Sequence, residues 1–193
     1  MSDYIRKYAD ISGCGKYRYL LQREWRGFAT DENWRWYGTK DGAGNPIGTP
    51  KSCMFVMLNP STADADVDDP TIRRCVGFAK AFKFDELCVV NLFAYRATKP
   101  KDLFAAGEAI HGDRNQEVIE KAGRDSGMII CAWGAHDKSA YQAEVVRGWL
   151  HWHEVVNTDV LTREPGGAQR AVEHLAGLAN ERLPTRGFLG AVV

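Results

Sequence analysis

Three continuous apolar runs in the middle of the chain predict the strands of a sheet. They span Cys53–Leu58, Leu87–Leu92 and Met128–Trp133. Runs of this length without polar alternation are typical of parallel strands that are buried on both faces. Because helical patterns separate them, they indicate a succession of strands and helices with a parallel sheet at its centre. A shorter apolar segment, Glu154–Asn157, predicts a fourth strand.

Amphipathic segments between these runs predict the helices. Together with a helical turn inside the loop Ala94–Ala106, the predicted helices are Thr71–Phe82, Asp113–Gly123, Lys138–Trp152 and Ala168–Asn180. Asp69 and Pro70 stand directly before the first helix as an N-cap and a first-turn proline, which is a standard helix beginning. We expect the chain after Leu183 to be loosely held.

The residues before Pro50 have a different pattern. Tyrosine, leucine, arginine and tryptophan alternate in Lys16–Phe28, and Trp34–Tyr37 follows a polar break, so the pattern predicts an antiparallel hairpin. Gly38–Pro50 lacks the phosphate-binding patterns GxxxxGK[ST] and GxGxxG and predicts a hairpin loop. The predicted fold is α/β: one domain over residues 1–193, a three-layer sandwich with a central, mostly parallel four-stranded sheet and an N-terminal antiparallel hairpin.

Composition narrows the classes of function. The chain has 25 Lys and Arg and 25 Asp and Glu, so its formal net charge is zero. A polyanion would therefore need a local patch of positive charge. The five cysteines lack CxxC spacing, which argues against a zinc or iron–sulfur site, and we interpret Cys53, Cys88 and Cys131 as buried free thiols. Their odd number, without an apolar signal segment or membrane-length run, favours the cytoplasm.

Polar side chains gather where the predicted parallel strands end. Asn59, Ser61 and Thr62 follow the first strand, Asn91 closes the second, and His136 follows the third. The carboxyl ends of parallel strands lie at one edge of a sheet, where ligands bind in open α/β folds. An amide both donates and accepts hydrogen bonds, so two asparagines at this edge suit the reading of a base or the holding of a water. Taken singly, each asparagine is an ordinary turn residue, and the histidine an ordinary helix-start residue.

Three stretches of the chain resemble a known family. LNPSTADADVDDPTIRRC begins at Leu58, VVNLFAYRATKP at Val89 and AWGAH at Ala132. Together they resemble a bacterial and phage family of proteins of unknown function (DUF1643-like), and the resemblance extends from about Ser12 to Thr162. That family is in turn similar to the uracil-DNA glycosylase superfamily, which implies a uracil-DNA-glycosylase-like fold and a base-excising activity.

The superfamily resemblance also implies roles for individual residues. In that superfamily the first core strand ends in Asn, Asp or Glu beside a proline, and this motif positions the attacking water. Asn59-Pro60 stands at the matching place. An asparagine after the second strand often reads the base, and Asn91 is the candidate. Trp133-Gly134 resembles the segment that closes the third strand.

One loop departs from the superfamily pattern. After the fourth strand the superfamily has a His-Pro-Ser type loop, and the nearer relatives have Gly-x-Pro-x-His-Pro. This chain has TREPGGAQR at Thr162–Arg170, without a histidine. Either Arg163 or Arg170 replaces the charge of that histidine, or the activity differs from uracil excision.

Cleavage of an N-glycosidic bond requires a held water, a negative or dipolar environment beneath the sugar, and stabilisation of the departing base. The candidate catalytic residues are Asn59, Asp64, Asp69 and His136. The candidate substrate-binding residues, which include rings to stack on a flipped base, are Pro60, Ser61, Asn91, Phe93, Tyr95 and Trp133. The candidate contacts to DNA phosphate are Thr62, Arg96, Arg163 and Arg170. No metal or other cofactor is expected.

The sequence therefore predicts a DNA glycosylase acting on a damaged or modified base. A modified base of phage DNA is the expected target, in antiviral defence or phage DNA metabolism, with DNA as the partner and no membrane. Three alternatives stay open. The first is a metal-dependent phosphodiesterase or nuclease that uses Asp64, Asp66 and Asp69. The others are a non-catalytic nucleic-acid-binding module and a hydrolase of free nucleosides or nucleotides.

Overall fold

The structure is a computed structural model that describes residues 4–25, 39–40, 46–47, 52–81, 84–134, 136–150, 155–156 and 187–189. Its elements in chain order are β1 (Arg6–Ile11), β2 (Arg18–Glu24), β3 (Thr39–Lys40), β4 (Pro46–Ile47), β5 (Ser52–Met57), α1 (Pro70–Ala81), β6 (Glu86–Asn91), α2 (Pro100–Ala105), η1 (Gly107–Ile110), α3 (Asn115–Asp125), β7 (Met128–Ala132), η2 (Asp137–Ser139), α4 (Ala140–Trp149), β8 (Val155–Val156) and β9 (Gly187–Leu189).

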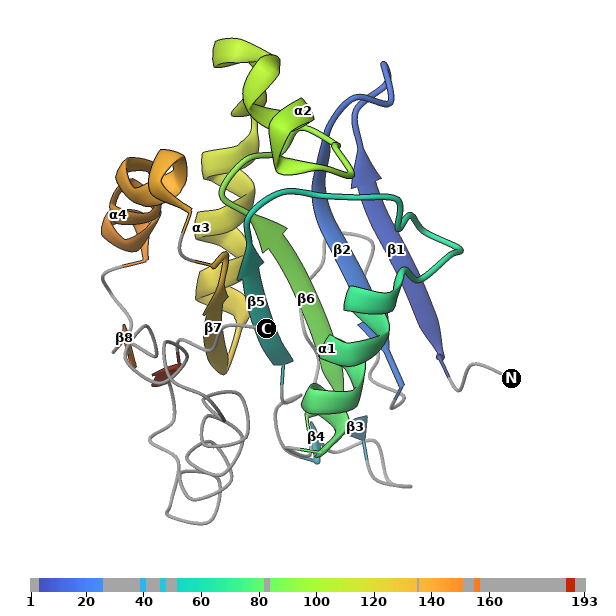
Figure 1. Ribbon diagram of the computed structural model, residues 1–193. Helices are drawn as coiled ribbons and strands as arrows, with labels where there is room; N and C mark the ends of the chain where they lie inside the picture. Colours follow the sequence, from blue (N-terminus) through green and yellow to red (C-terminus); the bar gives the residue numbers. More distant parts are fainter. Residues whose placement is uncertain are drawn as a thin grey trace, which may run out of the picture.

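The main sheet has seven strands in the order β1-β2-β6-β5-β7-β9-β8. β6, β5, β7, β9 and β8 run parallel to one another, and β2 lies antiparallel to β6. The predicted mixed α/β class is confirmed. The sheet is larger than the four strands predicted, because the N-terminal hairpin is continuous with it (Figure 1) and β9 adds a further strand.

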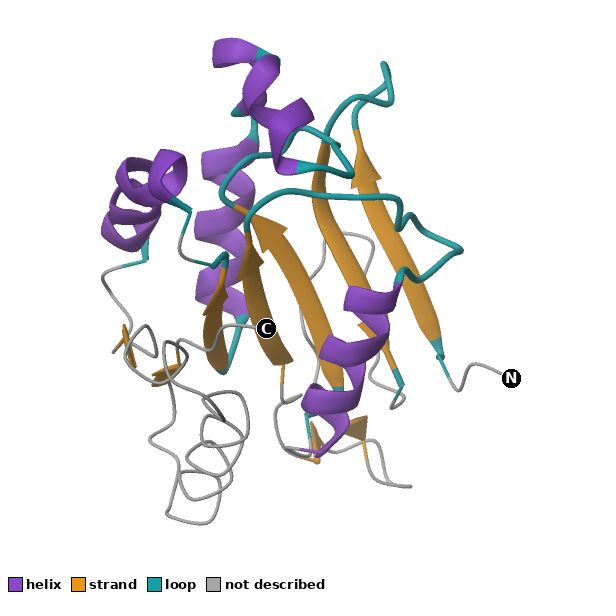
Figure 2. Cartoon of the chain, in the orientation of Figure 1, coloured by secondary structure: helices purple, strands orange, loops and turns teal. Residues whose placement is uncertain are grey.

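The helices cover the sheet in layers, with α1 on one face and α3 and α4 on the other (Figure 2). The alternation of β6 shows how the sequence achieves this arrangement. Leu87 and Val89 pack in the cluster on the α1 side, whereas Cys88 and Val90 pack in the cluster on the α3 side. Successive side chains of a strand point to opposite faces, so an unbroken apolar run supplies both clusters.

The N-terminal hairpin differs from the prediction. β2 falls within the predicted Lys16–Phe28, but its partner is β1, and its other edge pairs with β6. No residue of β1 is fully buried, and its sequence, RKYADI, has no apolar alternation that could mark it as a strand. The predicted partner Trp34–Tyr37 lies outside the described residues. Within Gly38–Pro50, the pairing of β3 with β4 confirms a hairpin.

The last elements are only partly described. The predicted strand Glu154–Asn157 is confirmed as β8. β9 lies between β7 and β8, so part of the tail expected to be loosely held is a strand of the sheet. The predicted helix Ala168–Asn180 lies outside the described residues.

A bulge in β2 determines the side of the sheet on which Arg18 lies. Asp10 of β1 pairs with Leu20, but the next residue, Ile11, pairs with Arg18, so Tyr19 is the extra residue. A bulge changes the alternation of a strand and redirects the side chain beside it. Arg18 therefore lies on the α1 side, beneath the loop that follows β5.

Candidate functional site

Three segments meet at the carboxyl edge of the parallel strands. They are the β1–β2 turn, the loop after β5, which crosses the neighbouring strands before α1 begins (Figure 1), and the loop after β6. Ala97 N donates a hydrogen bond to Pro60 O at 2.9 Å and joins the two loops. Arg96 N donates to Lys16 O at 2.9 Å and joins the second loop to the turn. Backbone hydrogen bonds thus fix segments that are far apart in sequence.

These segments surround an open pocket of about 350 Å³, which we call the rim pocket. Its polar side chains belong to Lys16, Ser61, Thr62, Tyr95, Arg96 and Thr98. Two cations and four hydroxyls therefore line it, and its lining residues include no carboxylate. Cationic and hydroxyl donors are the groups with which proteins hold phosphate. The structure thus brings together four predicted site residues from two loops.

The predictions missed Lys16 and Thr98 as members of this pocket. Lys16 lies in the turn between β1 and β2, beside Gly15, whose φ of +72° is the left-handed conformation that a tight turn uses. The sequence does contain this Gly-Lys pair. However, the pair indicates a site residue only after β1 is recognised as a strand. The segment is then a turn between β1 and β2 that reaches the carboxyl edge of the parallel strands.

Asn59 lies beside the rim pocket with a fixed amide orientation. Its Nδ2 donates hydrogen bonds to Pro60 O at 2.9 Å and to Ala97 O at 2.7 Å. An amide nitrogen carries two hydrogens, so both are used. Its Oδ1 receives no hydrogen bond from the described residues and is the free acceptor of this side chain. This geometry suits the predicted role of holding a water through the amide oxygen.

Asn91 is placed differently. It ends β6 opposite Met57 of β5, its exposed fraction is 0 %, and neither Nδ2 nor Oδ1 has a hydrogen-bond partner among the described residues. It alternates with Leu87 and Val89, so its side chain lies on the α1 side of the sheet. Asn59 and Asn91 therefore lie at the ends of adjacent strands, and Asn91 is not among the residues that line the rim pocket.

Asp64 and Asp69, the predicted catalytic carboxylates, accept hydrogen bonds from the backbone of their own loop. Asp64 Oδ1 accepts from Val67 N and Asp66 N, both at 2.9 Å, and these bonds lower the pKa of Asp64. Asp69 Oδ1 accepts from Ile72 N at 2.8 Å, which confirms it as the predicted N-cap of α1. Both carboxylates thus have structural contacts, and neither lines the rim pocket.

The buried Arg23 of β2 anchors the acidic end of this loop. Its Nε pairs with Asp68 Oδ1 at 2.7 Å, and its Nη2 donates to Asp64 O at 2.6 Å. Tyr4 OH donates to the other oxygen of Asp68 at 2.7 Å, and burial together with this bond raises the pKa of Tyr4. A signal for this contact exists in the sequence, since an arginine within an apolar strand needs a partner when it is buried.

Arg18 supports the same loop nearer the rim. Its Nη1 donates to Ala63 O at 2.8 Å, and its Nε has no partner among the described residues. Burial lowers the pKa of Arg18 to about 10, and the charge of Arg96 acts in the same direction. Arg18 is still a cation at neutral pH. It therefore adds to the positive potential on the inner side of the rim pocket.

Two of the three predicted stacking rings are part of the core. Phe93 is 2 % exposed and Trp133 is 7 % exposed, and both pack in the cluster on the α3 side. Tyr95 is half-buried and lines the rim pocket. Its ring also makes an edge contact with Tyr17, with centroids 5.8 Å apart. Of these three rings, Tyr95 is the one that a bound ligand can reach.

His136 follows β7 but does not line the rim pocket. Its Nδ1 accepts a hydrogen bond from Lys138 N at 3.2 Å, and its ring lies 4.8 Å from that of Phe104 on α2. The histidine thus caps η2 in this structure. Arg163 and Arg170, the predicted phosphate contacts of the last loop, lie outside the described residues.

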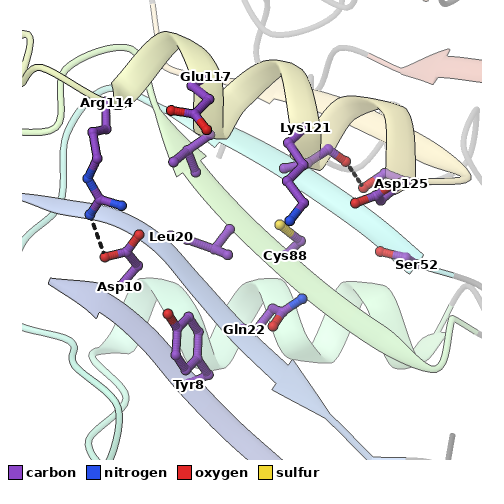
Figure 3. Close-up of a pocket in the computed structure, with 13 residues that line it drawn as sticks. Tyr8, Asp10, Leu20, Gln22, Ser52, Cys88, Arg114, Glu117, Lys121 and Asp125 are labelled. Carbon is purple, nitrogen blue, oxygen red and sulfur yellow. Dashed lines mark hydrogen bonds and ion pairs between the residues drawn. The ribbon is translucent and has the colours of Figure 1, made fainter. Parts of the chain in front are cut away.

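A separate cavity of about 180 Å³ lies between α3 and the β1–β2 hairpin (Figure 3). Its charged side chains have both signs. Asp10 pairs with Arg114 at 2.8 Å, and Glu117, Lys121 and Asp125 follow along α3. Mixed charges of this kind give no field of one sign, which distinguishes this cavity from the rim pocket.

The part of the chain that the structure describes has no group of three or more His, Cys, Asp or Glu side chains placed to hold a metal ion. Nor does any helix in those residues have the length and apolar character to cross a membrane. All five cysteines are thiols outside any disulfide, and the predicted burial of Cys53, Cys88 and Cys131 is confirmed, whereas Cys14 is exposed.

The fold and the site define a class: an α/β protein with a mixed sheet and an anion-type pocket at the carboxyl edge of its parallel strands. Residues 18–164 match the family described as Protein of unknown function (DUF1643), and the chain belongs to this family. The recognition made from the LNPSTA and NLFAYRAT motifs is thereby confirmed at the level of that family. No curated protein and no solved structure matches the chain.

Proposed function

We propose that this protein is a DNA glycosylase that hydrolyses the N-glycosidic bond of a flipped-out damaged or modified base. The observation that carries the proposal is the rim pocket, with Lys16, Arg96 and four hydroxyls, beside an asparagine whose amide oxygen receives no hydrogen bond from the residues that the structure describes. The pocket fits a phosphate of the DNA backbone, and Asn59 Oδ1 fits a water that attacks the adjacent sugar.

In the proposed reaction these groups hold the attacking water and the neighbouring phosphate. The oxygen of a water forms a bond to C1′ of the sugar and loses one of its two protons. The bond from C1′ to the base nitrogen breaks, its electron pair leaves with the base, and the base takes up one proton, so that the net reaction adds one water. Asn59 Oδ1 accepts a hydrogen bond from the water and fixes its direction of attack. Lys16 and Arg96 hold the neighbouring phosphate, so that the sugar stays in position.

The resemblance to the uracil-DNA glycosylase superfamily supports the proposal from the sequence. Asn59-Pro60 follows directly after β5, a central parallel strand, which is the position that the superfamily motif implies. The sandwich of the superfamily and its base-excising chemistry are part of this proposal. The altered loop at Thr162–Arg170 favours a substrate other than uracil, and a modified base of phage DNA, in antiviral defence or phage DNA metabolism, is the substrate that we propose.

The aspartates favour this chemistry over a metal-dependent phosphodiesterase. Such an enzyme would need Asp64, Asp66 and Asp69 to direct oxygens toward one ion. In the structure Asp64 closes a turn and Asp69 caps α1, so Oδ1 of each accepts hydrogen bonds from backbone N–H groups instead. The two activities also differ in their products, because a glycosylase leaves an abasic site and a free base, whereas a nuclease leaves a nick.

One observation favours a second candidate, a non-catalytic DNA-binding module. Asn91 and the rings of Phe93 and Trp133, which the prediction assigned to the base, are all buried. A protein that retains the phosphate-binding rim pocket but has no base pocket would bind DNA without turnover. Single-turnover reactions separate the candidates, since the module forms a saturable complex and releases no base.

The experiment that tests the proposal is mass spectrometry of the bases freed from a panel of natural and phage-modified DNAs, with EDTA present. We expect one free base and an abasic product. Asn59→Ala should lower the rate by more than about tenfold, because it removes an interaction needed mainly in the transition state.

Asp66→Asn is the matched control from the same loop, since its exposed side chain receives no hydrogen bond from the described residues. It should keep full activity. If the protein nicks DNA and EDTA abolishes the nicking, the protein is a metal-dependent phosphodiesterase and the glycosylase proposal is wrong. An Asn59→Ala variant as active as the unmodified protein would show that the site is misplaced.

A further inference from the structure

A second open pocket, of about 530 Å³, lies on the other side of the β1–β2 turn, and we call it the tyrosine pocket. Tyr17 and Tyr19 line it together with Cys14 from the turn and Glu108, His111 and Asp113 from the segment between α2 and α3. The two tyrosine rings are stacked, with centroids 6.2 Å apart and planes 14° from parallel. Tyr19 is buried, whereas Tyr17 is half-buried, so part of its ring is open to the pocket.

The segment that closes this pocket packs tightly against the rings. Gly112 has a φ of +73°, and a Cβ at this position would lie 2.9 Å from Tyr19 Cε1 and 3.3 Å from Tyr17 Cδ1. Only glycine combines this backbone conformation with so close an approach. Tyr19 OH also donates a hydrogen bond to Asp113. The walls of the pocket are therefore held in place by the fold.

The tyrosine pocket adjoins the rim pocket. The ring of Tyr17 contacts the edge of Tyr95, a residue of the rim pocket, with centroids 5.8 Å apart. The β1–β2 turn borders both pockets, with Cys14 in one and Lys16 in the other. An extended ligand can therefore occupy both pockets at once by crossing the Tyr17–Tyr95 contact.

The two pockets differ in charge. The rim pocket has Lys16 and Arg96 and no carboxylate, whereas the tyrosine pocket has Glu108 and Asp113 and neither lysine nor arginine in its lining. The hydrogen bond from Tyr19 lowers the pKa of Asp113, so this carboxylate is ionised at neutral pH. Phosphate is thus attracted to the rim pocket and repelled from the tyrosine pocket. The tyrosine pocket therefore fits an uncharged aromatic ring.

We propose that the tyrosine pocket is a stacking subsite for the nucleobase next to the phosphate in the rim pocket, so that a single strand of DNA crosses the β1–β2 turn and stacks one base on Tyr17. The proposal rests on the proposed function for its ligand, DNA. It adds a place and a direction for the strand, and it assigns Lys16 and Tyr17 to neighbouring parts of one nucleotide unit. Stacking on an aromatic side chain accepts any base.

The test measures binding, so it is independent of base excision. The probes are a short single-stranded oligonucleotide and inorganic phosphate, each titrated by calorimetry against the full chain. Tyr17→Ala should weaken oligonucleotide binding roughly tenfold, as expected for the loss of one base–aromatic stack, and leave phosphate binding unchanged. Tyr17→Phe should bind like the unmodified protein. Tyr141→Ala is the matched control, since Tyr141 is exposed on α4.

Cys14 supplies a second readout from inside the tyrosine pocket. It is the exposed cysteine, and the other four are buried, so alkylation by iodoacetamide reports on it. Saturating oligonucleotide should slow this alkylation, and saturating phosphate should not. Three results would overturn the inference. They are an unchanged oligonucleotide affinity in Tyr17→Ala, equal alkylation rates of Cys14 with and without oligonucleotide, and a complete lack of oligonucleotide binding. Intact binding and stacking without released base would instead overturn only the proposed function.

Discussion

The two halves of the motif LNPSTADADVDD do different work in the structure. In the first half, Ser61 and Thr62 line the rim pocket, and Asn59 lies beside it with an amide oxygen that receives no hydrogen bond from the described residues. In the second half, Asp64, Asp68 and Asp69 bind the protein itself, through a turn, an ion pair and a helix cap. The half that carries the charges is thus the scaffold, and the half with uncharged side chains is the site.

This difference shows which contacts fix the conformation of the loop after β5. A loop that leaves a strand at the rim must direct its first residues toward a ligand, although it has no secondary structure of its own. Arg23 and Arg18, both from β2, hold the acidic half through Asp68 Oδ1, Asp64 O and Ala63 O. The acidic residues therefore set the position of the site without forming part of it.

Arg23→Met should give the largest loss of stability. Arg23 is 0 % exposed and has Asp68 as its ion-pair partner, so its removal leaves a half-buried carboxylate without its counter-charge and with the hydrogen bond from Tyr4 alone. Removal of one partner of a buried ion pair costs about 3–5 kcal/mol. The free energy of unfolding, measured by urea denaturation, should fall by that order.

The double variant Arg23→Met with Asp68→Leu is the control for this prediction. Replacing both partners by apolar residues removes the unpaired charge, so it should recover a large part of the loss. If the single variant is as stable as the unmodified protein, Arg23 does not anchor the loop, and the division between scaffold and site is wrong.

Thr62→Val tests the other half of the motif. Thr62 is exposed in the rim pocket, and valine has the same shape without the hydroxyl. Stability should change by less than about 0.5 kcal/mol. Affinity for a short oligonucleotide should fall roughly tenfold, since a hydrogen bond to a charged group contributes about 1.5–3 kcal/mol. A variant that loses stability but keeps its affinity would reverse the assignment of the two halves.

Asp69→Ala should cost about 1 kcal/mol of stability, because Asp69 Oδ1 is the cap of Ile72 N. Asp69→Asn separates the structural role from a catalytic one. Asparagine is as good a cap as aspartate, but it has no charge to offer the reaction. Thermal unfolding and base release should therefore both be near those of the unmodified protein in Asp69→Asn. A large loss of base release in that variant would restore Asp69 as a catalytic residue.

The sequence predicted the layers of the fold better than it predicted the site. β5, β6, β7 and α1 follow from apolar runs and a helix cap, which are local patterns. β1 was missed, because Arg6–Ile11 has no fully buried residue and no apolar alternation. The role of Asp68 was missed for a related reason, since its partner, Arg23, lies 45 residues away on β2, between β1 and β6 in the sheet. Such pairings depend on the assembled sheet, whereas the burial of a strand depends on its own composition.

Asp64→Asn should have the smallest effect on stability, and this effect should depend on pH. Its carboxylate accepts two backbone hydrogen bonds, which hold its pKa below the ordinary value for aspartate. A group with a lowered pKa in the folded state stabilises the protein above its unfolded pKa, and that contribution disappears as the pH falls through the folded value. Asp64→Asn keeps an oxygen acceptor and loses the charge. The unmodified protein should therefore be more stable than the variant at about pH 6, and the difference should disappear as the pH falls through the lowered pKa of Asp64. Asp66→Asn is the control, and its stability relative to the unmodified protein should not change with pH in this way, because the exposed side chain of Asp66 receives no hydrogen bond from the described residues. If the difference in stability for Asp64→Asn stays constant as the pH falls, the charge of Asp64 does not hold the turn.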